Sequence, residues 1–94
     1  MAIPEQQEAF VQYLKTHYTY AHPENMASEV FYVKRHNIGM PFDAIFQNTQ
    51  SMEQARTLLI AHFEKIGRKA PRNHASVHYN DWLLFKEFLE HTLN

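Results

Sequence analysis

A basic segment is the most informative polar feature of the sequence, because four of the nine lysine and arginine residues lie within eight consecutive positions. Its members are Lys65, Arg68, Lys69 and Arg72. No acidic residue interrupts the chain between Glu64 and Asp81. A basic loop that leads into a helix N-terminus is suited to bind phosphate, because backbone N–H groups and side-chain cations converge there. We therefore predict contact with a nucleic-acid backbone; the alternative is a solvated loop whose charges offset the dipole of the preceding helix.

Polar and aromatic side chains follow this basic segment at the expected start of the last helix. They include His74, Ser76, Tyr79 and Asn80. Side chains of these types contact sugar, phosphate or base edges in protein–DNA complexes. We include His74 and Tyr79 in the predicted nucleic-acid-binding surface.

The seven histidines raise the question of a metal site. His74 and His78 are four residues apart, a spacing that places two imidazoles on one face of a helix. No glutamate completes an HExxH motif, and the chain contains no cysteine, so surface histidines are favoured over metal ligands. His17 and His62 fall on the expected apolar stripes of their helices. We predict that these two lie at the edge of the core, each with a satisfied ring nitrogen.

The sequence offers little for catalysis. Glu87 and Glu90 form an i, i+3 pair on the expected solvent side of a helix, and Asp43 stands alone in a loop. A glycine-rich phosphate loop is excluded because the chain has only Gly39 and Gly67, and a cysteine nucleophile is absent. We predict that the chain is not an enzyme and needs no cofactor.

Length and composition favour a single helical domain that spans residues 1–94. The net charge of −1 gives no global attraction to nucleic acid or to acidic membranes, so any such attraction must be local. No apolar run approaches the roughly 20 residues of a membrane span, and the N-terminus lacks the features of a signal peptide. Together with the absence of cysteine, these features predict a cytoplasmic protein without a membrane partner. They leave its oligomeric state open.

Apolar periodicity predicts an all-α fold, a compact bundle of four helices near residues 4–20, 23–37, 51–67 and 74–92. A turn or 3₁₀ segment is expected around residues 42–46. Pro4 and Pro23 mark helix starts, whereas Gly39 and Gly67 mark helix ends. A capping box that begins at Ser51 is expected to open the third helix. Asn73 is the expected N-cap of the last helix.

The last helix is expected to organise the core. Trp82, Phe85, Phe88 and Leu89 are spaced at i, i+3, i+6 and i+7, which places them in one stripe. Apolar residues cover more than half of this helix, and a helix of that kind usually needs partners on two sides. We therefore expect all four residues to be buried.

The order of the helices resembles the N-terminal core-binding (SAM-like) domain of tyrosine recombinases and phage integrases. Three segments carry the resemblance. EAFVQYLKTHY is similar to the opening helix of that family, PFDAIFQNTQSMEQARTLLIAHFEKIGRK to the helix that leads into a basic turn, and ASVHYNDWLLFKEFLEH to the final helix. NMASEVFYVKRHNIG fits the second helix more loosely.

The resemblance implies a SAM-like bundle that binds DNA through its second helix, its basic turn and the start of its fourth helix. By position, it nominates Lys34, Arg35, Arg68, Lys69, Arg72, His74 and Tyr79. The chain has no room for the catalytic domain that usually follows in this family, so the resemblance implies a non-catalytic module.

A protein-interaction module is the alternative function that the sequence supports. Such a module, for example a subunit or inhibitor from a mobile element, would use the same bundle to bind a partner protein without binding DNA. The near-neutral charge and the excess of aromatic residues favour this alternative. It predicts that Tyr32, Tyr79 or Trp82 contributes to an exposed apolar patch, whereas the DNA hypothesis predicts a positive face that joins the second helix to the basic segment.

Overall fold

The last helix, α6 (Pro71–Leu93), has 23 residues and forms the centre of the structure. The computed structural model describes residues 4–93, and within that range it contains helices and no strands. The other helices are α1 (Glu5–His17), α2 (Pro23–Val30), α3 (Tyr32–Arg35), α4 (Phe42–Ile45) and α5 (Thr49–Lys65). The predicted all-α bundle is therefore confirmed.

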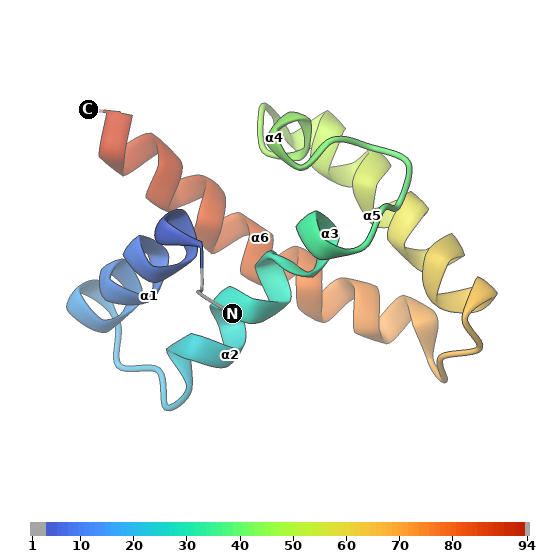
Figure 1. Ribbon diagram of the computed structural model, residues 1–94, viewed down its shortest axis with the longest axis horizontal. Coiled ribbons are helices and arrows are strands. Elements are labelled where there is room, and N and C mark those ends of the chain that lie inside the picture. The colour runs from blue at the N-terminus through green and yellow to red at the C-terminus, as the bar shows by residue number, and fades with distance from the viewer. Residues whose placement is uncertain (1–3, 94) are drawn as a thin grey trace.

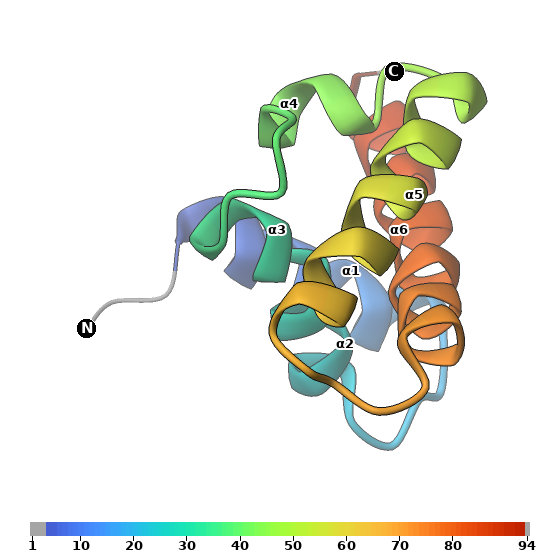
Figure 2. The ribbon, with the colours of Figure 1, turned by 90° about the vertical axis from the view of Figure 1, so that its right-hand side faces the viewer.

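The other helices lie on two sides of α6. In Figure 1, α1 and α2 pack against each other and against α6 on one side, whereas α5 lies on the other side with α4 against it. Figure 2 shows α5 and α6 side by side and antiparallel, joined at one end by a short connection. This arrangement explains the broad apolar surface of α6, because the helix is covered from both sides.

Phe85 occupies the middle of the core. Its ring centroid lies 4.8 Å from that of Phe46, 5.1 Å from that of Phe10 and 5.4 Å from that of Phe31. The prediction that Trp82, Phe85 and Phe88 are buried is confirmed. Leu89 was predicted to be buried with them, but it is only partly buried and lines a shallow surface hollow beside α4. The short α4 covers this end of α6 incompletely.

The second predicted helix, residues 23–37, is divided in two. Phe31 has φ −83° and ψ 1°, outside the helical range, and it separates α2 from α3. Its ring is buried and lies 4.9 Å from that of Phe42. Packing of this aromatic side chain thus accompanies the break in the helix. Helix α3 ends at Arg35, so the prediction that Gly39 ends this helix was wrong: Gly39 lies four residues further on, in the following loop, with φ +99°.

Several predicted helix ends were wrong by a few residues. Helix α1 ends at His17 instead of residue 20. The segment after Pro41, predicted as a turn or a 3₁₀ segment, is a single α-helical turn. Asn48, not Ser51, caps α5: its Oδ1 accepts a hydrogen bond from the Ser51 N–H at 2.7 Å. The last helix begins at Pro71, so Asn73 lies inside it and is not its N-cap. Proline is favoured in the first helical turn because it has no N–H to satisfy.

Candidate nucleic-acid interface

The basic turn (residues 65–72) connects α5 to α6, and its conformation is set by the end of α5. The Gly67 N–H donates to the Glu64 carbonyl at 3.1 Å, and the Arg68 N–H donates to the Phe63 carbonyl at 2.9 Å. Gly67 has φ +76°. These features define a Schellman motif, in which a glycine in the left-handed region ends the helix. The predicted role of Gly67 is therefore confirmed.

The Schellman motif also places the Arg68 side chain. Its guanidinium carbon lies 4.5 Å from the centroid of the Phe63 ring and 5.8 Å from that of Tyr32. An apolar contact often joins the two ends of a Schellman motif, and here a cation–π contact takes that place. Arg68 therefore connects the basic turn to α3.

The adjoining rings of Tyr32 and Phe63 lie at the centre of a histidine cluster, which we define as His36, His62, His74 and His78. The Tyr32 ring stacks on His36 at 4.2 Å between centroids, and its hydroxyl lies 2.9 Å from His62 Nε2. The rings of His74 and His78 lie 6.2 and 5.5 Å from the Phe63 ring. The satisfied ring nitrogen predicted for His62 is confirmed. His17 lies outside this cluster and is exposed, with its ring against Tyr13.

Burial lowers the pKa of two members of the histidine cluster, His78 and His62. His78 is 6% exposed, and its burial lowers its pKa more than the charge and the backbone hydrogen bond of Glu29 raise it; Arg68 and His74 add to the lowering. Burial also lowers the pKa of His62, together with the nearby charges of His36, Arg68 and Lys65. His78 Nδ1 lies 3.0 Å from the Glu29 carbonyl oxygen. Because a carbonyl oxygen can only accept, Nδ1 carries the hydrogen and donates a hydrogen bond to it.

A pair of carboxyl groups lies on the same side of α6 as His78. The Asp81 side chain is 7% exposed and hydrogen bonds to the Glu29 side chain. Burial raises the pKa of Asp81 to about 8, and the hydrogen bond and negative charge of Glu29 act in the same direction. The protonated Asp81 therefore donates to a Glu29 oxygen near neutral pH. This pair anchors α2 to α6 close to the basic turn.

The structure brings together some of the predicted binding residues. Lys65, Lys69, Arg72 and His74 are exposed on the basic turn and the first turn of α6, beside Arg68. A hollow of about 190 Å³ beside them is lined by Glu29, Arg68, His74, Val77 and His78. The first turn of α6 has no acidic residue, so its positive dipole end is not offset by a carboxylate of its own.

Other predicted binding residues lie elsewhere. Lys34 Nζ is 5.6 Å from the centroid of the Phe42 ring, on the side of α3 that faces α4. Arg35 donates to the Ser28 carbonyl at 3.1 Å and so lies along α2. Tyr79 is half-buried between α5 and α6, with the Arg56 guanidinium 5.3 Å from its ring. These three side chains are not part of the group around Arg68.

Sequence analysis missed the residues that support the basic turn from beneath. Glu29 and Tyr32 come from α2 and α3, and no short-range pattern links them to the turn. His78, which was predicted to be a surface histidine, is buried instead; it and Asp81 interrupt the apolar stripe of the last helix at i, i+3, a pattern that could have indicated both. Within residues 4–93, no group of three or more histidine or acidic side chains is arranged to hold a metal ion.

Comparison with family models, with curated proteins and with solved structures found no match to this chain. Its function is therefore inferred from the geometry of the basic turn and of its surroundings.

Replacing Gly67 by alanine should lower the free energy of unfolding by about 1 kcal/mol, because alanine is disfavoured in the left-handed region. A Cβ at this position would meet no atom within 4 Å, so the cost should come from the backbone alone. Gly67→Asn is the matched variant. Asparagine tolerates the left-handed region, so this variant should lose less of its free energy of unfolding. Urea unfolding of the three proteins measures the difference. Equal stability of Gly67→Ala and the wild type would contradict the role of Gly67 as the left-handed residue that ends α5.

Proposed function

We propose that the chain is a non-catalytic, cytoplasmic DNA-binding module that contacts the phosphate backbone through its basic turn. The main support for this proposal is the position of Arg68. The Schellman motif and the rings of Phe63 and Tyr32 hold its side chain, and three further exposed cations lie on the same turn. A cation fixed in this way loses little side-chain freedom on binding phosphate. Residues on two separate segments, the turn and α3, thus support one surface.

The distribution of charge along the chain supports the same proposal. Residues 65–80 contain four cationic side chains and no acidic one, so the rest of the chain has five cationic and ten acidic residues. Glu87 and Glu90 lie near the opposite end of α6, roughly 24–28 Å from its first residue, Pro71, at 1.5 Å per residue. A negatively charged duplex would be attracted to one end of the molecule and repelled from the other, which orients binding despite a net charge of −1.

The resemblance to the core-binding domain of tyrosine recombinases favours DNA over other polyanions and suggests a SAM-like bundle. Under this proposal, the basic turn and the start of α6 approach the DNA. Lys34 and Arg35, which the resemblance also nominates, would make secondary contacts from α3. None of the described helices combines the length and the apolar character that a membrane-spanning segment requires.

The alternative of a protein-interaction module receives no support from an aromatic patch. Trp82 is fully buried, and Tyr32 and Tyr79 are half-buried, with Arg68 and Arg56 over their rings. A different observation, a groove beside α5, favours protein binding on a separate surface.

Replacing Arg68, Lys69 and Arg72 together by glutamine should weaken binding to duplex DNA and reduce its salt dependence. Each phosphate contact adds about 0.9 to the slope of log affinity against log salt concentration. We therefore expect the slope to fall by about two to three. Fluorescence anisotropy with a labelled duplex, measured from low to moderate salt, gives both slopes.

A control variant separates the effect of the turn from that of net charge. The control combines Lys15→Gln, Lys86→Gln and Gln50→Glu, at exposed or partly exposed sites outside the turn. It lowers the net charge of the chain by three, as the triple variant of the turn does. In this control, the slope of log affinity against log salt concentration should stay within about 0.9 of the wild-type slope, the equivalent of one phosphate contact. The proposal fails if the wild type does not bind, or if both variants bind as the wild type does.

A further inference from the structure

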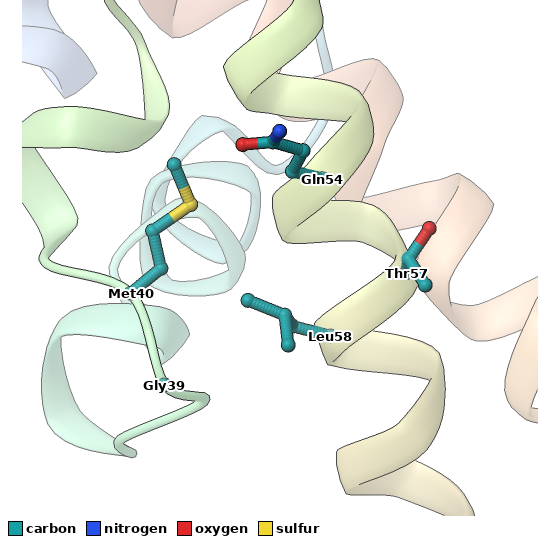
Figure 3. Close-up of a pocket in the computed structure, with 5 residues that line it drawn as sticks. All are labelled: Gly39, Met40, Gln54, Thr57 and Leu58. Atoms are coloured by element: carbon teal, nitrogen blue, oxygen red, sulfur yellow. The ribbon is translucent and has the colours of Figure 1, made fainter.

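A groove of about 440 Å³ lies between α5 and the loop that joins α3 to α4. Its lining residues are Gly39, Met40, Gln54, Thr57 and Leu58. Figure 3 shows Leu58 pointing from α5 toward the loop and Met40 extending from the loop toward Gln54. Neither side chain is fully buried, so both present apolar surface to the groove.

A second hollow of about 220 Å³ continues the groove along α5. It is lined by Asn37, Ile38, Leu58, Ala61, His62 and Lys65. Because Leu58 lines both hollows, they lie on either side of this side chain and form one surface along α5. The combined groove extends from Gln54 to Lys65, about 16 Å at 1.5 Å per residue.

The walls of this groove are fixed in the folded chain. Ile38 is 7% exposed and anchors the loop in the core. The Gly39 N–H donates to Asn37 Oδ1 at 2.8 Å, and Pro41 restricts the backbone that follows. The opposite wall is the regular helix α5. A preformed apolar groove needs little reorganisation to accept a ligand.

The charge along the groove is uneven. Lys65 carries the charge at one end, where it lies beside His62, whereas Gln54 and Thr57 at the other end are neutral. No acidic residue lines either hollow. A ligand that fits must therefore offer apolar groups to Met40 and Leu58 and negative charge to Lys65. Apolar side chains with neighbouring carboxylates on one short segment of protein meet both requirements.

We propose that the groove is a docking site for a peptide segment of a partner protein, with one or two large apolar side chains followed by acidic residues. The apolar side chains fill the hollow beside Leu58 and Met40, and the carboxylates face Lys65. The length of the groove fits an amphipathic helix of about three turns or a shorter extended segment. The groove shares Lys65 with the basic turn, whereas its apolar lining, Met40 and Leu58, lies outside that turn.

Selection from a displayed library of random 12-residue peptides on the purified full chain tests this inference. Recovered peptides should combine leucine, methionine or phenylalanine with aspartate or glutamate. Their binding, followed by two-dimensional NMR of the labelled protein, should shift the amide signals of Gly39, Met40, Leu58 and Ala61. Ala61→Glu should weaken that binding at least tenfold, because it places a carboxylate in the groove, four residues before Lys65.

Ala9→Glu is the matched control, because it makes the same substitution at an exposed position of α1. It should leave peptide affinity within about twofold of the wild type. The carboxylate introduced by Ala61→Glu would lie at i, i+4 from Lys65, a favourable helical spacing, so this variant should fold; thermal unfolding verifies that. The proposal is overturned if no peptide is recovered, if recovered peptides lack acidic residues, or if they bind Ala61→Glu as tightly as the wild type.

Discussion

Replacing Phe85 by alanine should lower the free energy of unfolding by about 3–5 kcal/mol, a large part of the total stability of a small domain. The Phe85 ring is fully buried and contacts rings from α1, from the α2–α3 junction and from the segment around α4. No neighbouring side chain can fill the resulting cavity without giving up its own contacts. Urea unfolding monitored by circular dichroism measures the loss.

Leu83→Ala is the matched control for Phe85→Ala. Leu83 lies two residues away on the same helix, but its side chain is 45% exposed. Its truncation should cost less than about 1 kcal/mol. If Phe85→Ala and Leu83→Ala lowered the free energy of unfolding equally, the conclusion that Phe85 lies at the centre of the aromatic core would be wrong. Leu89→Ala should fall between the two, because Leu89 is partly buried.

Replacing Asp81 by asparagine should stabilise the protein above neutral pH and have little effect near pH 4. The pKa of Asp81 is raised to about 8 in the folded chain, so the folded chain retains a proton that the unfolded chain releases near pH 4. The free energy of unfolding therefore falls as pH rises from about 4 to about 8. Asparagine stays neutral and can still donate to Glu29. We expect a gain of about 1–3 kcal/mol at pH 8, since water near the pair screens part of the effect.

The exposed Asp43 provides a control for the pH experiment. Asp43→Asn makes the same substitution outside the core and should change the free energy of unfolding by less than about 0.5 kcal/mol at either pH. Thermal or urea unfolding at pH 4, 6 and 8 compares the three proteins. A difference between Asp81→Asn and the wild type that does not grow with pH would contradict the protonated state of Asp81.

Periodicity was sufficient to predict the helical class and most of the core. Trp82, Phe85 and Phe88 follow a helical stripe that packing preserves, and Gly67 ends α5 as its residue type suggests. The break at Phe31 could not be predicted, because it accompanies contacts with Phe42 and Phe85, which are distant in sequence. Capping was misassigned at Ser51 because Asn48, three residues earlier, is an equally good cap residue.

The candidate interface was only partly predictable for the same reason. The cations of the basic turn are adjacent in sequence, so composition alone located them. The support beneath Arg68 comes from Tyr32 and Phe63, and the neighbouring carboxyl pair joins Glu29 to Asp81. The contacts of Tyr32 with Arg68 and of Glu29 with Asp81 join helices that are distant in sequence, and local patterns do not encode them. Sequence proximity also suggested that Tyr79 belongs to the turn, whereas the helical rotation directs it toward Arg56.

Binding of DNA by the basic turn can be measured residue by residue with NMR. A short unlabelled duplex is titrated at low salt into the ¹⁵N-labelled wild-type chain, and amide shifts are mapped onto the structure. We expect the largest shifts in residues 65–74 and smaller ones in α3, with the C-terminal half of α6 unchanged. All shifts should diminish as salt is raised. Absence of shifts at low salt, or shifts confined to other surfaces, would contradict DNA binding by the basic turn.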